Sequence, residues 1–156
     1  MDLFYKISLL LHSWNRYSIL IGGIIVIVFA LKGLKSGTPY RNADRKSMLF
    51  FVSSLHFQLF IGLILYFFVS PVTTLALNDF GAAMKDSTMR FWAVEHAFVN
   101  IIAVAAAQTG SILVKRKLPD HNKHKRALIW TSVALLLIIA MIPMGIMGVD
   151  RPWFRF

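Results

Sequence analysis

Four long blocks of apolar residues divide this sequence, and nearly all its charged residues stand between them. The blocks cover approximately residues 7–34, 48–69, 91–114 and 127–148. Each reaches the roughly 20 residues that an α-helix needs to cross about 30 Å of hydrocarbon. A soluble helical protein carries charged residues along the outer face of every helix instead. The pattern predicts an all-α integral membrane protein, a four-helix bundle built as a single domain of residues 1–156.

The charges between the blocks are distributed unequally between the two sides of the membrane. Short connections favour an up-down-up-down bundle, so the loops 32–47 and 115–126 fall on one side. These two loops hold eleven basic and two acidic residues, whereas the other side holds six basic and five acidic residues. Cytoplasmic loops carry an excess of Lys and Arg. We therefore expect both loops to be cytoplasmic and both termini to lie outside.

The formal net charge of +10 does not indicate nucleic-acid binding, because the basic residues stand in short loops rather than on a folded polar surface. The lipid bilayer is the partner that the composition predicts. The sequence contains no cysteine, which excludes disulfides, thiolate metal sites and covalent haem attachment. It also lacks G-x-S-x-G, P-loop and H-E-x-x-H motifs, so an enzyme acting on a soluble substrate has no support.

Local signals mark several helix ends. Ser70-Pro71 ends the second block, because proline cannot continue a helix, and Asp86 or Ser87 is suited to cap the third. Pro143 predicts a kink near the end of the fourth block. The segment 78–85 is a candidate for a short helix on the outer surface.

Ionisable residues inside a membrane span cost free energy and mark functional sites. His12 in the first block and His96 in the third each lie about one turn inside the outer boundary, so their rings can approach at one depth. Arg16 and Asn100 follow them by four residues and share their helix faces. A second pair, His56 with His124, falls in the cytoplasmic half with a poorer match in depth.

Two histidines that face each other from separate helices suit the axial ligation of a b-type haem. The sequence therefore indicates His12 and His96 as ligands of an outer haem, with His56 and His124 as weaker candidates for an inner one. Arg16 is placed to neutralise a haem propionate, and Glu95 to handle the proton of a bound quinone head-group. The alternatives are interfacial histidines with purely structural hydrogen bonds, and an ion pair of Glu95 with Arg16 or Arg90.

Several stretches taken together resemble a family of small four-helix bacterial inner-membrane proteins commonly labelled "cytochrome b". They are Leu11-His-Ser-Trp-Asn-Arg16, His56-Phe-Gln58 with Gly62, Met84-Lys-Asp-Ser87, Arg90-Phe-Trp-Ala-Val-Glu-His96, Lys123-His-Lys125 and Ile142-Pro143. The resemblance covers essentially the whole chain and implies location in the bacterial cytoplasmic membrane. The histidines at 12, 56, 96 and 124 correspond to the histidines that recur in those motifs, so the label implies that they bind haem. With haem bound, we expect the chain to be an electron carrier that exchanges electrons with quinol or with a partner on the outer side. The arrangement of the four histidines is similar to that of two-haem transmembrane b-type cytochromes. The chain departs from those proteins in having four spans.

Two other functions remain open from the sequence. One is a cofactor-free accessory subunit of a larger respiratory or transport complex, with Gly22, Gly23, Ala103 and 105–107 forming a flat patch toward lipid and partners. The other is a metal transporter or sensor in which His12, His96 and Glu95 are the ligands. The sequence is compatible with the accessory subunit, with the metal transporter or sensor and with the electron carrier.

Overall fold

The computed structural model describes residues 2–144 and 149, in which helices joined by short loops are the main secondary structure and no strand is present. The long helices are α1 (Asp2–Ser36), α2 (Asn42–Ile64), α6 (His96–Val114) and α7 (Asp120–Ala140). Short helices follow α2 along the chain: α3 (Pro71–Asn78), α4 (Phe80–Ala83) and α5 (Ser87–Arg90). Two π-helical segments, η1 (Leu65–Val69) and η2 (Phe91–Glu95), continue α2 and precede α6.

Three of the continuous helices are long and apolar enough to cross a membrane: Leu3–Ser36, Asn42–Val69 and Ser87–Val114. Within the described residues α7 does not join them, because its first two turns, Asp120–Arg126, are rich in charge. The all-helical fold and the three long apolar helices confirm the predicted class, and they are compatible with a membrane protein.

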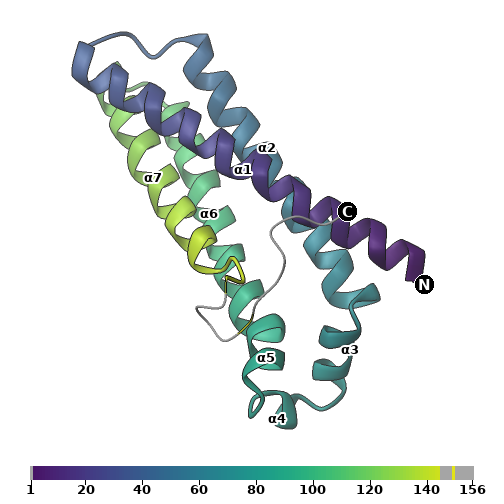
Figure 1. The fold of residues 1–156 in the computed structure, drawn as a ribbon. Coiled ribbons are helices and arrows are strands. Elements are labelled where there is room, and N and C mark those ends of the chain that lie inside the picture. Colours follow the sequence, from purple (N-terminus) through teal and green to yellow (C-terminus); the bar gives the residue numbers. More distant parts are fainter. Residues whose placement is uncertain (1, 145–148, 150–156) are drawn as a thin grey trace.

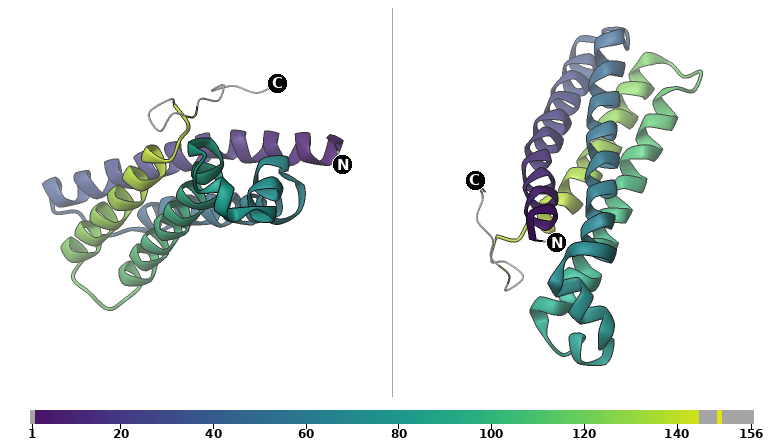
Figure 2. Two further views of the ribbon diagram at one scale, coloured as in Figure 1. Left: turned by 90° about the horizontal axis from the view of Figure 1, so that it is seen from below. Right: turned by 90° about the vertical axis from the view of Figure 1, so that its right-hand side faces the viewer.

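The long helices pack side by side, α1 against α2 and α7, and α6 against α7 and α2. Figure 1 and the right-hand view of Figure 2 show the connections α1–α2 and α6–α7 at one end of the molecule. We call this the basic end, because most of the Lys and Arg residues stand in the loop 115–119 and in the helix ends beside the two connections. The helices α3, α4 and α5 lie at the opposite end, where α1 and α2 separate from α6 and α7 (Figure 1).

The helix ends that local signals predicted are present. Helical structure stops at Val69, and Ser70 caps the next helix, in which Pro71 takes the first position. The Asp86 carboxylate accepts a hydrogen bond of 2.7 Å from the Met89 amide, so it caps α5 and hence the continuous helix 87–114. A short helix does form within 78–85, and it begins behind the Asp79 side chain, which accepts a hydrogen bond from Ala82.

The fourth block differs from its predicted bounds. Helix α7 begins at Asp120, earlier than expected, and ends at Ala140, so Pro143 follows the helix and does not kink it. The reason is local, because a proline disfavours helical geometry in the residue before it and removes a backbone donor. Residues 145–148 of the predicted block lie outside the described residues.

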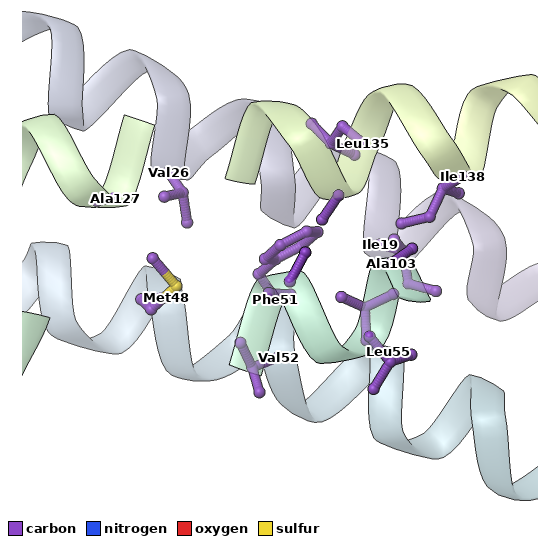
Figure 3. Close-up of a cluster of buried hydrophobic side chains, with 14 of the residues drawn as sticks. Ile19, Val26, Met48, Phe51, Val52, Leu55, Ala103, Ala127, Leu135 and Ile138 are labelled. Atoms are coloured by element: carbon purple, nitrogen blue, oxygen red, sulfur yellow. The ribbon is translucent and has the colours of Figure 1, made fainter. Parts of the chain in front are cut away.

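A hydrophobic core fills the space between the long helices from the basic end to the middle of the molecule. Figure 3 shows side chains of α1, α2, α6 and α7 meeting there, among them Ile19, Phe51 and Leu135. Gly22, Gly23, Ala103, Ala106 and Ala107 are also buried, and only Ala105 of the predicted small-residue patch is exposed. That patch is therefore not a lipid-facing surface, because these small side chains let the helices pack closely inside the protein.

Candidate functional site

The half of the molecule beside α3–α5 contains a cavity of about 560 Å³. Its walls come from α1, α2, η1, α3, α4, η2, α6, the end of α7 and the segment that follows it, and most lining side chains are apolar or aromatic. A few polar side chains also line it: His12, Ser13, Arg16, Gln58, Tyr66, Ser70, Thr73, Trp92, His96 and Asn100. Ligand and cofactor sites are usually apolar cavities of about 300–1,000 Å³ with a small number of placed polar groups.

Two histidines from different helices face each other in this cavity. The ring centroids of His12 on α1 and His96 on α6 lie 6.2 Å apart, with the ring planes tilted by 54°. The structure thus brings the two rings of the predicted outer pair close together at the border of one cavity.

His96 is held in one orientation by its surroundings. Its Nδ1 lies 3.1 Å from the carbonyl oxygen of Met141, and because a carbonyl only accepts, Nδ1 carries the proton. The rings of Phe91 and Trp92 pack beside it, with centroids 5.7 Å and 5.1 Å away. This leaves Nε2 as the lone-pair nitrogen, which is the usual arrangement of a metal-binding histidine.

His12 presents a buried polar atom without a bond, since its Nδ1 has no hydrogen-bond partner. Its backbone is fixed by α2, because Gln58 Nε2 donates to the His12 carbonyl oxygen at 2.9 Å. Asn15 donates both to Gln58 Oε1 and to the carbonyl oxygen of Ser54, each at 2.8 Å. The polar clamp of Asn15, Ser54 and Gln58 joins α1 to α2 beside the histidine, and it leaves the ring itself available.

Gly62 on α2 gives the His12 ring its space. A Cβ atom at this position would stand 3.2 Å from His12 Cε1, which is tighter than an ordinary van der Waals contact. Gly62 also lines the cavity. The glycine therefore keeps room beside a candidate ligand, where a larger residue would press on the ring.

Arg16 and Glu95 have different surroundings. Arg16 lines the cavity one turn after His12, and its guanidinium lies 5.1 Å from the centroid of the Tyr17 ring. Glu95 instead forms an ion pair with Arg90, in which Nε and Oε1 are 2.9 Å apart. The predicted ion pair of Glu95 with Arg90 is confirmed.

The metal-transporter alternative needed His12, His96 and Glu95 as joint ligands. Across residues 2–144 and 149, no group of three or more His, Cys, Asp or Glu side chains is arranged to hold a metal ion. The Arg90 pair engages the Glu95 carboxylate. The three-ligand site is therefore wrong for the described chain, whereas two axial histidines of a haem need no third protein ligand.

The inner pair is not brought together. His56 is exposed on the outer surface of α2, where its Nδ1 bonds to the Val52 carbonyl oxygen of its own helix at 2.8 Å. His124 is only 1% exposed, and its Nε2 bonds to the Thr38 carbonyl oxygen at 3.1 Å. The two rings have separate surroundings because helix rotation, which the sequence does not fix, directs one outward and the other inward.

His124 is enclosed by the basic end of the molecule. The Tyr40 ring centroid lies 5.1 Å from that of His124, and Asp44 Oδ1 is 3.9 Å from its Nδ1. Gly33 of α1 packs directly on the imidazole, so closely that a Cβ atom there would overlap the ring. His124 thus fastens the α1–α2 loop to α7, which leaves no space for a haem beside it.

The sequence did not indicate a role for three groups in or beside the cavity: Asn15, Met141 and Tyr66. Asn15 stands in an apolar block one turn after His12, and that polar position was a signal that could have identified it. Met141 contributes only its carbonyl oxygen, which the helix end before Pro143 leaves free for His96. The Tyr66 hydroxyl donates to the Ala93 carbonyl oxygen at 2.7 Å and joins η1 to η2. Both segments are π-helical, a geometry often found at functional sites and without a sequence signature.

Comparisons with protein-family models, curated proteins and solved structures gave no match for this chain. Its function therefore has to be argued from its own residues.

Proposed function

We propose that this chain is a membrane electron carrier that binds one b-type haem between His12 and His96. In this proposal α7 completes a four-helix transmembrane bundle of up-down-up-down topology in the bacterial cytoplasmic membrane. The basic end faces the cytoplasm and both termini face the outside, in accord with the unequal loop charges. The cavity then lies in the outer half of the membrane.

The observation that carries the proposal is the pair of imidazoles, 6.2 Å apart, on two helices that border one cavity. His96 offers Nε2 because its Nδ1 bonds to Met141, and His12 has a buried nitrogen without a bond. Gly62 gives the His12 ring room to lie against α2. These features together fit a bis-histidine haem.

The residues of this chain hold, orient and shield such a group. A haem supplies reversible one-electron transfer, and its potential depends on axial ligands, nearby hydrogen bonds and burial. The clamp on α2 fixes the backbone of His12, and the Met141 carbonyl oxygen polarises the imidazole of His96. Arg16, which lines the same cavity, offers a positive charge to a propionate.

One haem accounts for the histidines better than two. A second haem was expected between His56 and His124, but His56 is exposed and His124 is enclosed by Gly33, Thr38 and Tyr40. A single outer haem exchanges electrons on one side of the membrane only. We therefore propose a carrier that serves a redox partner at the outer side.

A quinone head-group is a second candidate ligand of the same cavity. Leu63 and Phe67 on one side, with Phe98 and Ile101 on the other, line the cavity and are also exposed on the surface. The cavity thus opens between α2–η1 and α6, where a membrane bundle faces lipid. A lipid-soluble quinol can enter there and meet the polar side chains of Gln58 and Asn100. In this alternative the histidines exchange protons with the quinol.

The first experiment is a visible spectrum of the protein purified in mild detergent from haem-supplied cells, oxidised and then reduced with dithionite. We expect the sharp reduced bands of a six-coordinate b haem, at one haem per chain. Colourless protein that retains an extractable quinone would replace the haem with the second candidate. Colourless protein without quinone would overturn both.

Histidine variants provide matched controls within the chain. His12→Ala and His96→Ala are each expected to abolish the six-coordinate spectrum. His56→Ala and His121→Ala remove exposed imidazoles and are expected to retain the full haem content. Loss of haem from His56→Ala would show that the assignment of the site to the outer pair is wrong.

A further inference from the structure

His56 is an ionisable residue on the exposed face of α2, the face that does not pack on the other helices. It stands half-way along the helical span Asn42–Val69, and its ring is exposed rather than directed into the core. Ionisable side chains in the middle of a membrane span almost always face a partner or a cavity, because hydrocarbon does not solvate them. A ring in this place therefore needs a partner that the single chain does not supply.

The hydrogen bonding of His56 defines what that partner must offer. Nδ1 donates to the Val52 carbonyl oxygen at 2.8 Å, which leaves Nε2 as an acceptor directed away from its own helix backbone. Ser53, three residues earlier, is exposed on the same face of α2 and carries a hydroxyl donor. One face of one helix thus presents a matched acceptor and donor.

Such a face is complementary to itself. We infer that two copies of this chain associate through the exposed face of α2, with the Ser53 hydroxyl of each copy donating to His56 Nε2 of the other. All copies insert in the same orientation, so a twofold axis along the membrane normal places the two α2 helices parallel at equal depth. Ser53 and His56 then differ in depth by about 4.5 Å, which an imidazole side chain spans.

The remaining side chains of this face suit close packing of two helices. Leu49 and Phe60 are 58% and 63% exposed, and they flank the polar pair at helical spacing. Ser53 is the small residue between them, and small residues at membrane helix interfaces let backbones approach. A cofactor-free accessory role and the haem proposal are both compatible with this dimer, which rests on neither.

The absence of cysteine makes a direct test possible. Leu49→Cys introduces the only thiol of the chain and retains the Ser53 hydroxyl, and oxidation in native membranes is expected to link two copies. Val28→Cys is the matched control, because Val28 on α1 is 53% exposed, close to the 58% of Leu49, and lies at a similar distance from the α1–α2 loop. We expect at least roughly tenfold more linked dimer from Leu49→Cys, because a disulfide needs Cα atoms within about 7 Å.

The role of His56 is tested in the Leu49→Cys background, in which the Ser53 hydroxyl is present. His56→Leu is expected to lower the linked fraction roughly fivefold to tenfold, the effect of losing interhelical hydrogen bonds in a membrane. His56→Gln, which retains a polar group, should recover much of it. The dimer is overturned if Val28→Cys links equally well, if His56→Leu has no effect, or if Leu49→Cys links to a different protein. The haem spectrum of the same preparations reports separately on the proposed function.

Discussion

The two ends of this molecule use the same residue type in opposite ways. At the basic end, His124 is packed against Gly33, bonded to Thr38 and covered by Tyr40. At the α3–α5 end, His12 and His96 border a cavity of about 560 Å³. One half of the helix packing is closed by small residues and aliphatic side chains, whereas the other half is held apart.

The role of each histidine in this protein therefore depends on the residues that surround its ring. An imidazole with a bonded nitrogen and no adjacent space stabilises a loop. An imidazole with a lone pair directed into a cavity is available to a ligand. Matched substitutions at the two ends test this difference.

The largest contrast is expected between His12→Ala and His124→Ala. His12→Ala should abolish haem binding while leaving the free energy of unfolding of the apoprotein nearly unchanged, because it removes a buried nitrogen that has no bond. His124→Ala should lower the free energy of unfolding by about 2–4 kcal/mol through a lost hydrogen bond and a new void. Its haem content per folded chain should stay normal. Haem quantification and thermal unfolding in detergent measure the two effects, and equal losses in both variants would break the comparison.

The glycines give the second contrast. Gly33→Ala is expected to lower the free energy of unfolding by about 1–3 kcal/mol, because the new methyl group overlaps the His124 ring. Gly62→Ala presses on His12 at 3.2 Å and should weaken haem binding about tenfold, as is typical when the support of a metal ligand is disturbed. Gly81→Ala is the control, since its Cβ meets nothing closer than 3.7 Å. Haem titration of each apoprotein measures the affinity for haem, which should be weakened in Gly62→Ala and unchanged in Gly81→Ala.

The clamp between α1 and α2 is expected to have an intermediate effect. Gln58→Leu removes the bonds to Asn15 and to the His12 carbonyl oxygen, and it should lower the free energy of unfolding by about 1–2 kcal/mol. Gln108→Leu replaces the same residue type on α6 and should change stability little. A shift in the haem reduction potential of Gln58→Leu, absent from Gln108→Leu, would sharpen the link between the clamp and His12.

The smallest effect concerns pH at the basic end. Burial, with a further contribution from the Asp44 carboxylate, raises the pKa of Tyr40 to about 12. The folded protein therefore favours the neutral phenol, a contribution that is fully present below about pH 10 and is lost as the pH rises toward 12. Thermal unfolding between pH 8 and 11 should decline less steeply in Tyr40→Phe than in the unchanged protein. Identical profiles would contradict this account of Tyr40.

Sequence alone predicted the features that depend on local chemistry. Apolar length predicted four membrane spans, and three helices of the described residues are long and apolar enough to cross a membrane. Ser70-Pro71 predicted the end of the second span, and Asp86 or Ser87 was predicted to cap the third, a role that Asp86 takes. The positions of His12 and His96 in their apolar blocks predicted that the two residues lie at the same depth in the membrane. Each stands about one helical turn from the outer end of its block, and every residue adds the same rise along a helix. Pro143 was recognised as a disruption, although it ends α7 instead of kinking it.

Only the tertiary structure decided which way each helix turns. Spans that are apolar on every side carry no strong signal for an inward face, so the sequence did not reveal that His56 points outward or that His124 is enclosed. The same reason explains the small residues, which were expected toward lipid and pack inside at Gly23 and Ala103. The rotation of each helix about its axis is set by how its side chains pack against the other helices. That packing makes His124 an anchor of a loop, leaves His12 and His96 as candidate ligands, and places His56 at a candidate interface.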